Sequence, residues 1–180
     1  MPIKSPFDIP QLQFELPRLA FIALGSNIGD SKGSVLQAMD RLQTLSDFPP
    51  LRSSLWQSTP VDCPPGSPLF VNAVVGLLPR ANETPDSLLA ELQTLETEFG
   101  RQPKQALNEP RPLDLDLISF RQETRDSERL TLPHPRAHLR RFVLQPLSEI
   151  APDLVLPGQV LNVRQLLETL DSSERLLRLG

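Results

Sequence analysis

Residues 110–118 of the chain read PRPLDLDLI. From Leu113 to Leu117, three leucines alternate with Asp114 and Asp116, which is the period-two pattern of a β-strand. The leucines would face a hydrophobic core, and both carboxylates would project from the opposite face of the strand. This stretch therefore predicts an element that joins the core to a polar site.

Two carboxylates are an unusual choice for one face of a strand. Residues i and i+2 lie roughly 6.5–7 Å apart, aspartate is depleted in strands, and like charges on one face repel. A cation between Asp114 and Asp116 would relieve that repulsion. Two aspartates with few other protein ligands suit Mg²⁺, which keeps waters and takes further oxygens from substrate phosphates. A solvated strand face is the alternative that these residues alone leave open.

The composition is that of a single globular domain. Of the 180 residues, 39% are hydrophobic and 22% are charged, and the single cysteine, Cys63, excludes an internal disulfide. No run approaches the ~18 apolar residues of a membrane span. Residues 1–17 lack the pattern of a signal or transit peptide, so we expect a cytoplasmic protein.

The charge distribution narrows the class of ligand. A net charge of -4 argues against non-specific binding of nucleic acid. Nine of the 18 Lys and Arg residues nevertheless fall between Arg101 and Arg141, the window that holds the aspartate pair. A locally basic site in an acidic protein favours a small polyanion.

The order of elements indicates an α+β fold. Periodicity and turn residues predict strands and helices, with Ser31 and Thr84 as helix N-caps. The strands are expected over 19–24, 51–58, 69–78, 110–118 and 129–132, and the helices over 31–46, 85–99, 137–150 and 162–170. This is a split βαβ (βαββαβ) arrangement with helices on one face of a mostly antiparallel sheet and additional C-terminal helices. Residues 1–18 are expected to form an irregular arm, and residues 19–180 a single domain.

Three side chains suggest a ligand site beside the aspartates. Alternation along residues 69–78 places Phe70 and Asn72 on one strand face, where a ring and an amide can stack on a flat heterocycle and read its edge. Glu96 falls inside the apolar arc of its helix, so it either reaches solvent or meets a specific partner such as a ligand hydroxyl. Core packing is the alternative for Phe70.

The segment Gly25-Ser-Asn-Ile-Gly29 follows a predicted strand, as a phosphate-binding loop would. It lacks both the Gly-x-Gly-x-x-Gly and the Gly-x4-Gly-Lys-Ser/Thr spacings. We therefore expect neither a standard dinucleotide site nor a P-loop here, and a tight strand-to-helix turn is the simpler interpretation.

Taken together, several segments of the chain resemble the 6-hydroxymethyl-7,8-dihydropterin pyrophosphokinase family. The resemblance runs from about residue 19 to about residue 157. Its most specific part is the combination of the strand of Asp114 and Asp116 with the segment Leu132-Pro-His-Pro-Arg136. The matching stretches are Ala23-Leu-Gly-Ser-Asn27, Ser58-Thr-Pro60, Phe70-Val-Asn-Ala73, Pro110-Arg-Pro-Leu-Asp-Leu-Asp116, Leu132-Pro-His-Pro-Arg136 and Arg140-Arg-Phe142. It implies a ferredoxin-like fold and transfer of pyrophosphate from ATP to the pterin hydroxymethyl group, with release of AMP.

The resemblance also implies site residues and partners. Asp114 and Asp116 would hold two Mg²⁺ ions that bridge the ATP phosphates, and they would act in catalysis together with Arg101 and Arg111. The pterin would be bound by Thr59, Pro60, Phe70, Asn72 and Phe142. ATP would be bound by Gln93, Glu96, Arg101, Arg111, Arg129, Thr131, His134 and Arg140. The expected partners are these two small molecules, with no nucleic acid and no membrane, and the expected state is a monomer.

The loop before the aspartate strand departs from the family pattern. Pro103, Asn108 and Glu109 stand where the family usually has arginine, tryptophan and glycine. In the family this loop closes over the substrates, and closure of this kind excludes water and completes the site. Two alternatives therefore stay open: a non-catalytic pterin- or nucleotide-binding paralogue, and an enzyme of two-metal nucleotidyl transfer.

Overall fold

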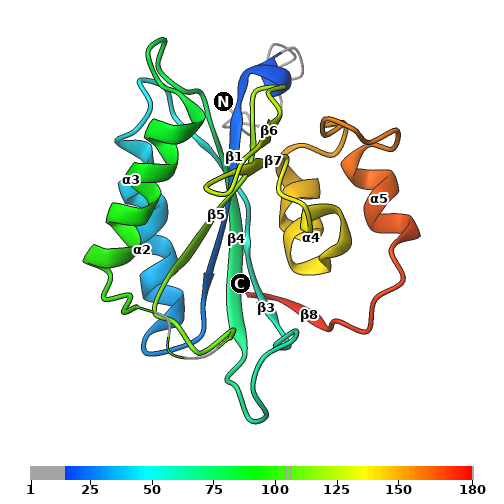
Figure 1. Cartoon of the computed structure of the whole chain (residues 1–180). Helices are drawn as coiled ribbons and strands as arrows, with labels where there is room; N and C mark the ends of the chain where they lie inside the picture. The colour runs from blue at the N-terminus through cyan, green and yellow to red at the C-terminus, as the bar shows by residue number, and fades with distance from the viewer. Residues whose placement is uncertain (1–14, 104, 106, 180) are drawn as a thin grey trace, which may run out of the picture.

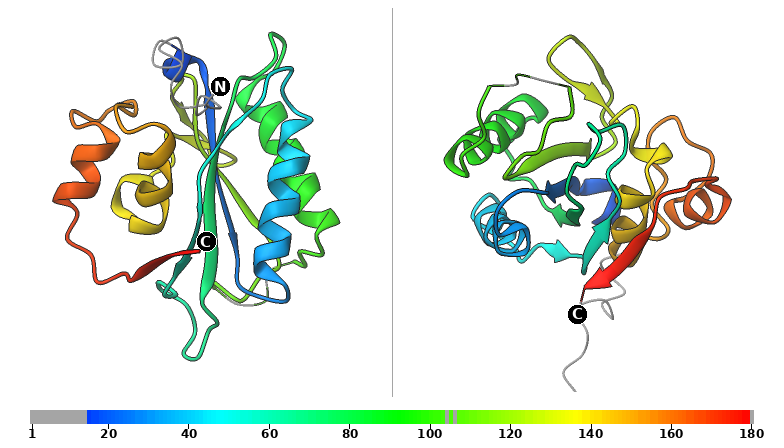
Figure 2. Two further views of the ribbon diagram at one scale, coloured as in Figure 1. Left: turned by 180° about the vertical axis from the view of Figure 1, so that it is seen from behind. Right: turned by 90° about the horizontal axis from the view of Figure 1, so that it is seen from below.

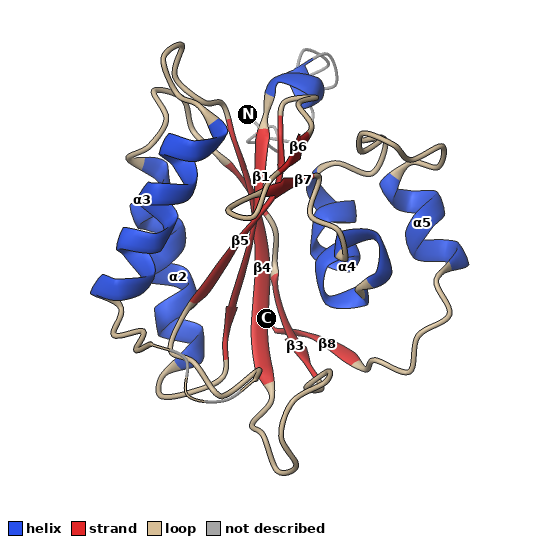
Figure 3. Ribbon diagram, viewed as in Figure 1, coloured by secondary structure: helices blue, strands red, loops and turns tan. Residues whose placement is uncertain are grey.

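The computed structural model describes residues 15–103, 105 and 107–179 (Figures 1 and 3). In chain order its elements are η1 (Leu16–Arg18), β1 (Ala20–Ser26), α2 (Ser31–Gln43), β2 (Leu51–Arg52), β3 (Leu55–Ser58), β4 (Phe70–Leu77), α3 (Pro85–Glu98), β5 (Asp114–Phe120), β6 (Arg125–Asp126), β7 (Thr131–Leu132), η2 (Ala137–Leu139), α4 (Arg141–Ile150), α5 (Val163–Thr169) and β8 (Leu176–Leu179).

The main sheet has the strand order β5-β1-β4-β3-β8, with β2 also paired to β4. All of its pairings are antiparallel. Helix α2 connects β1 to β3 across the position of β4, and α3 connects β4 to β5 across β1. The α+β prediction of two interleaved βαβ units is confirmed.

Helices α2 and α3 cover one face of the sheet (Figure 1). Their buried residues pack against Leu113, Leu115 and Leu117 of the aspartate strand and against inward-facing residues of β1 and β4. Thr84 caps α3 as predicted, because its side chain accepts a hydrogen bond from the backbone of Ser87. The leucines therefore face the core, as their alternation predicted.

The other face of the sheet is covered by α4, and α5 packs against α4, so both lie on the far side of the sheet from α2 and α3 (Figure 2). The prediction of helices on one face is confirmed for α2 and α3, and the C-terminal helices, which the prediction gave only as additional elements, form a layer on the other face. Phe21, Val74 and Ile118 point to this second face and pack against Val143, Leu147 and their neighbours. A sheet that is apolar on both sides needs a helical layer on each, and the continuously apolar run at residues 19–24 already carried that signal.

The second face changes character along β5. Asp114 and Asp116 alternate with the buried leucines and lie on the face of Ile118, which packs in the α4 layer. The apolar layer thus ends before the carboxylates, and this end of the sheet face is polar.

Several local predictions differ from the structure. Asp30, rather than Ser31, caps α2, because its carboxylate accepts a hydrogen bond from the backbone N–H of Gly33 at 3.1 Å. The strand expected over 51–58 is divided into β2 and β3. Strand β8 was not predicted, because its pairing with β3 joins segments more than 100 residues apart.

The N-terminal arm lies mostly outside the described residues. Its end forms the short 3-10 helix η1, and Leu16 packs with Phe21 and Val74 on the second face of the sheet. No helix among the described residues is long and apolar enough to cross a membrane.

We predict that Gly76→Ala destabilises the protein. Gly76 pairs with Phe21 across the β1–β4 ladder, and a Cβ there would lie 2.8 Å from Cε1 of the fully buried Phe21 ring. Overpacking of this kind costs about 1–3 kcal/mol, measurable as a lower urea midpoint. Adding Phe21→Leu should recover part of the loss in the double variant. Strictly additive losses would contradict the contact.

Candidate active site

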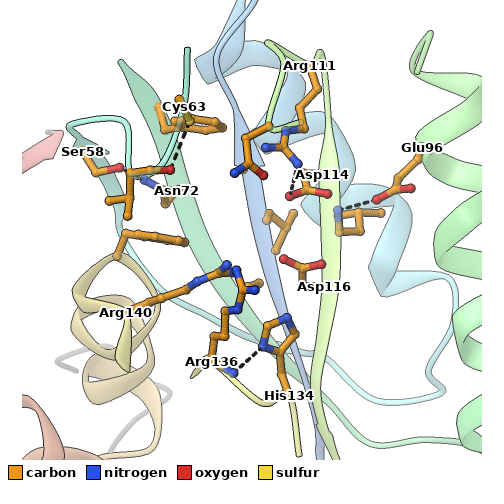
Figure 4. A pocket seen from close by; sticks show the side chains of 18 of the residues that line it. Ser58, Cys63, Asn72, Glu96, Arg111, Asp114, Asp116, His134, Arg136 and Arg140 are labelled. Carbon is orange, nitrogen blue, oxygen red and sulfur yellow. Dashed lines mark hydrogen bonds and ion pairs between the residues drawn. The ribbon is translucent and has the colours of Figure 1, made fainter. Parts of the chain in front are cut away.

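A cavity of about 360 Å³ opens at the polar end of the second sheet face (Figure 4). Strands β1, β4 and β5 form its floor. Of the predicted site residues, those that line it are Thr59, Phe70, Asn72, Gln93, Glu96, Arg101, Arg111, Asp114, Asp116, His134, Arg140 and Phe142. Pro60, Arg129 and Thr131 do not line it, and Arg129 and Thr131 are exposed. The fold thus gathers most of the predicted residues around one cavity.

Asp114 is neutralised by two arginines. Nη1 of Arg101 lies 2.6 Å from one carboxylate oxygen, and Nη1 of Arg111 lies 3.2 Å from the other. All three side chains are about four-fifths buried, so solvent screens these charges only partly. In this structure, the guanidinium groups of Arg101 and Arg111 supply the positive charge beside Asp114.

Glu96 reaches around the sheet edge to β5. Its Oε1 accepts hydrogen bonds from the backbone N–H of Leu115 and from Nη1 of Arg101, both at 2.8 Å. Because β5 is the edge strand, that N–H would otherwise have no partner in the ladder. Burial raises the pKa of Glu96, and these two donors oppose the shift. The sequence left open whether Glu96 reaches solvent or meets a specific partner. The structure shows specific partners, and they are Arg101 and Leu115 of the protein itself.

Asp116 is the unpaired member of the carboxylate pair. No ion-pair partner lies within 4 Å of it in the described part of the chain, in contrast to Asp114. Burial raises the pKa of Asp116 to about 7, and the charge of Asp114 adds to the shift, while Arg140 and Arg111 oppose it. Asp116 therefore presents a carboxylate to the cavity that is open to a new partner (Figure 4).

The donor set fits a metal that takes few ligands from protein. Among the described residues, no cluster of three or more His, Cys, Asp or Glu side chains could hold an ion. The protein would therefore supply only Asp114 and Asp116, and the other ligands would come from water and substrate. This suits Mg²⁺, which is commonly bound by one or two carboxylates together with substrate phosphates.

His134 is neutral in this environment. Burial, together with the nearby charges of Arg140 and Arg136, lowers the pKa of His134 to about 4. Its Nδ1 accepts a hydrogen bond from the backbone N–H of Arg136 at 3.1 Å. The proton must then reside on Nε2, so His134 presents a neutral N–H donor. The sequence had left open whether this residue is neutral or cationic.

The floor between β1 and β4 is shaped by Gly25. A Cβ at this position would lie 3.4 Å from Oδ1 of Asn72 and 3.7 Å from the Phe70 ring. The glycine therefore keeps space beside the amide and the aromatic side chain. The amide nitrogen of Asn72 donates to Oγ of Ser58 at 2.6 Å, which holds the buried amide in one orientation.

Each of the two predicted stacking rings has an arginine over it. The guanidinium of Arg111 lies 5.8 Å from the centre of the Phe70 ring, and that of Arg140 lies 5.4 Å from Phe142. Cation–π contacts of this kind hold both partners in place. Aromatic and cationic groups thus alternate along the cavity wall.

Asn27 connects the glycine-containing segment to the site. Its Oδ1 accepts from the backbone N–H of Arg111 at 2.9 Å, and its own N–H donates to the carbonyl of the same residue at 3.2 Å. Its amide nitrogen also donates to the carbonyl of Pro68. The segment therefore positions Arg111, which is a different task from phosphate binding. The turn predicted here is confirmed at Gly29, where φ is +70°.

Sequence reasoning missed some lining residues. Arg136 belongs to the Leu132–Arg136 stretch that carried the resemblance, so its motif was the available signal. Asn108 was noted only as a departure, yet its side chain donates to the carbonyl of Asp62 at 2.7 Å and joins the two loops beside the cavity. Cys63 also lines the cavity, and nothing in its local sequence indicated this.

We predict that Asp116→Asn stabilises the metal-free protein at pH 8. Because the pKa of Asp116 is raised to about 7 on folding, its charge costs stability above pH 7, and this cost disappears as pH falls toward 4. The gain at pH 8 should be on the order of 1–3 kcal/mol. Thermal unfolding in EDTA from pH 4 to 9 should show a difference that grows up to pH 7 and then levels off. A difference independent of pH would contradict this.

Comparison with known proteins identifies relatives of the chain. A family model described as 7,8-dihydro-6-hydroxymethylpterin-pyrophosphokinase (HPPK) matches residues 21–152. Two relatives are named 2-amino-4-hydroxy-6-hydroxymethyldihydropteridine pyrophosphokinase. The one from Synechocystis is 37% identical over 93% of this chain and 82% of its own length, and the one from Haemophilus influenzae is 41% identical over 77% and 85%.

Solved structures agree on the fold. The structure titled "Crystal Structure Analysis of the HPPK-DHPS in complex with substrates" superposes with a TM-score of 0.62 at 10% identity. The match covers 84% of this chain and 43% of that one, so this chain corresponds to less than half of that protein. The family match and the closely similar relatives carry the assignment: the chain belongs to the 7,8-dihydro-6-hydroxymethylpterin-pyrophosphokinase family and is a pyrophosphokinase-type transferase.

Proposed function

We propose that this protein transfers the terminal pyrophosphoryl group of ATP to the hydroxymethyl oxygen of 6-hydroxymethyl-7,8-dihydropterin in the presence of Mg²⁺. The products are the pterin diphosphate and AMP, and the reaction is a step of folate biosynthesis. One observation carries the proposal: a single cavity combines a ring-binding part with a pair of carboxylates set among arginines.

The ring-binding part suits a flat, polar-edged heterocycle. Phe70 and Phe142 both line the cavity, from β4 and from the start of α4. A pterin can stack on aromatic faces, and the groups on its edge need fixed hydrogen-bond partners. Asn72 is held in one orientation by Ser58 and is buried next to this space. Rigid partners of this kind favour one ligand edge over others.

The phosphate-binding part is formed by arginines and His134. Arg101 and Arg111 both contact Asp114. Arg140 lies across the cavity from Arg111 (Figure 4). Nε of Arg111 is buried and has no hydrogen-bond partner among the described residues. A buried donor without a partner is costly, and a phosphate oxygen would satisfy it. The neutral Nε2–H of His134 can donate to another such oxygen.

The aspartates and the arginines divide the charge compensation. When bound, Mg²⁺ would neutralise phosphate charge between Asp114 and Asp116. Arg101 now occupies one oxygen of Asp114 and would move its contact to phosphate as the ligands enter. The reaction joins the pterin oxygen to the β-phosphorus, breaks the bond between the β-phosphorus and the α,β-bridging oxygen, which leaves with AMP, and releases the hydroxyl proton. The chain must hold the attacking and leaving oxygens in line.

The altered loop does not remove the charges that this proposal needs. Arg101 and Arg111 still reach Asp114 from either end of the loop. Asn108 contacts the carbonyl of Asp62, and a carboxylate oxygen of Glu109 accepts from the backbone N–H of Gln105 at 3.0 Å. Asn108 and Glu109 thus make contacts of their own. Retention of both aspartates, of Arg111 and of His134 in the cavity supports catalysis over a solely binding role. The monomeric state, the cytoplasmic location and the roles of Pro60, Arg129 and Thr131 stay predictions.

A coupled assay tests the proposed reaction. Purified protein incubated with ATP, Mg²⁺ and the hydroxymethyl dihydropterin should form AMP only when the pterin is present. Asp116→Ala should lower kcat by at least about a hundredfold, since it removes one of two metal-binding carboxylates. Pterin binding without AMP would instead identify a non-catalytic binding protein. AMP formation that ignores the pterin would contradict the substrate assignment.

A second prediction concerns the stacking ring. Phe142→Ala should raise the KM for the pterin roughly tenfold or more, as expected when one aromatic stacking partner of a heterocycle is removed. The KM for ATP should change less than about twofold. Phe142→Leu keeps the bulk of the side chain without its π-face and serves as the matched control. Equal increases in the two KM values would refute the assignment of this ring to the pterin.

A further inference from the structure

Helix α4 lacks the N-terminal cap that a helix of its length normally has. Its N-cap residue is Arg140, whose side chain makes no capping hydrogen bond, and its first residue is Arg141. Two arginines at the positive end of the helix dipole are unfavourable, and the first backbone N–H groups need acceptors. This helix start also carries Phe142 and Arg140 into the cavity.

The missing cap comes from Glu174, more than 30 residues later in the chain. Its carboxylate accepts hydrogen bonds from the backbone N–H of Arg141 at 2.9 Å and from that of Phe142 at 3.4 Å. Ser172 orients it, because its hydroxyl donates to Oε2 at 2.7 Å and accepts from the backbone N–H of Glu174 at 3.2 Å. A carboxylate is the favourable group at this helix end.

The residues that follow Glu174 bind a second segment that lines the same cavity, at the end of β3. The backbone N–H of Arg175 donates to Oγ1 of Thr59 at 3.3 Å, and its carbonyl accepts from the Thr59 N–H at 3.2 Å. Strand β8 then continues along the edge of β3, from Leu176 opposite Ser58 to Leu179 opposite Leu55 (Figure 1). Two groups of Thr59 are therefore already used, which leaves its carbonyl for a ligand.

We propose that residues 171–179 fasten the two walls of the pterin pocket together and that Glu174 is a positioning residue for pterin binding. The proposal rests on the function proposed above. The segment lies beyond the region that the family model matches, which ends at residue 152. Residues 171–179 thus join the start of α4, which carries Phe142, to Thr59, which directly follows β3.

The physical effect of the cap is on the placement of Phe142. Without Glu174, the N–H groups of Arg141 and Phe142 would turn to water, and the first turn of α4 would fray. The ring would then sample orientations that do not stack on the pterin, and this ordering cost would be added to each binding event. The aspartates lie on β5, and among the described residues Glu174 forms no hydrogen bond with β5 or α3, so both elements would keep their positions.

The test compares Glu174→Ala with Asn162→Ala in the full-length protein. Asn162 caps α5 through the backbone N–H of Gln165 at 2.9 Å and does not line the cavity, so it controls for the loss of a helix cap. The Kd of the hydroxymethyl dihydropterin is measured with saturating Mg²⁺ and an ATP analogue whose α,β-bridging oxygen is replaced by methylene, which blocks turnover. Glu174→Ala should raise this Kd about fivefold to tenfold, in line with the loss of one cap.

The controls separate positioning from general destabilisation. Asn162→Ala should lower Tm to a similar extent with an unchanged Kd, and Glu174→Gln, which retains one acceptor oxygen, should lie between Glu174→Ala and the unaltered protein. The Kd of the ATP analogue should rise less than the pterin Kd in the two Glu174 variants, because Arg140 is one of several cationic groups in the phosphate-binding part, and it should stay unchanged in Asn162→Ala. An unchanged pterin Kd in Glu174→Ala, or equal increases in Glu174→Ala and Asn162→Ala, would overturn the inference.

A ligand-free measurement distinguishes failure of the inference from failure of the proposed function. Hydrogen exchange of the Arg141 and Phe142 amides should accelerate about fivefold or more in Glu174→Ala, because these two amides lose their acceptor. Unchanged exchange would refute the cap itself. If exchange accelerates in Glu174→Ala but the unaltered protein does not bind the pterin, the proposed function is refuted and the cap stands.

Discussion

The charge of two aspartates on one strand face is the constraint on which the rest of this structure depends. Asp114 and Asp116 stand where the apolar layer under α4 ends, and their repulsion has to be balanced. The fold balances Asp114 with Arg101 and Arg111, whereas Asp116 has no ion-pair partner among the residues that the structure describes. Glu96 then anchors both Arg101 and the backbone of β5. The same group of side chains thus balances the charge of Asp114 and holds the edge strand β5 in place.

The site is assembled from parts of the chain that do little alone. Asn27 fixes the backbone of Arg111, Gly25 leaves room beside Asn72, and the backbone of Arg136 selects the tautomer of His134. Each of these contacts prepares a donor, an acceptor or an empty volume before any ligand arrives. Preorganisation of this kind lowers the cost of binding, because fewer groups must be ordered at that moment. The same logic extends to Glu174, whose cap prepares the helix start that carries the second ring.

The arrangement also accounts for what the departures in the 101–110 loop leave intact. Catalysis by phosphoryl-transfer enzymes rests mainly on positioning and on charge compensation. Arg101 and Arg111 supply that charge from the two ends of the loop, where they reach Asp114. Asn108, between them, contributes a contact to the backbone of Asp62. The loop can therefore differ in its middle while the charges around the aspartates are retained.

The sequence by itself determined the elements whose signal is local. Period-two alternation identified the strand of Asp114 and Asp116, and Thr84 and Pro85 indicated the start of α3. The stretches that resemble the pyrophosphokinase family contain most of the residues that line the cavity. Tertiary structure alone decided strand β8, the partners of Glu96 and the cap from Glu174. These contacts join residues far apart in the chain, and a local pattern contains no information on which distant group satisfies a free N–H or a buried charge. Satisfaction of such groups is a property of the packed molecule.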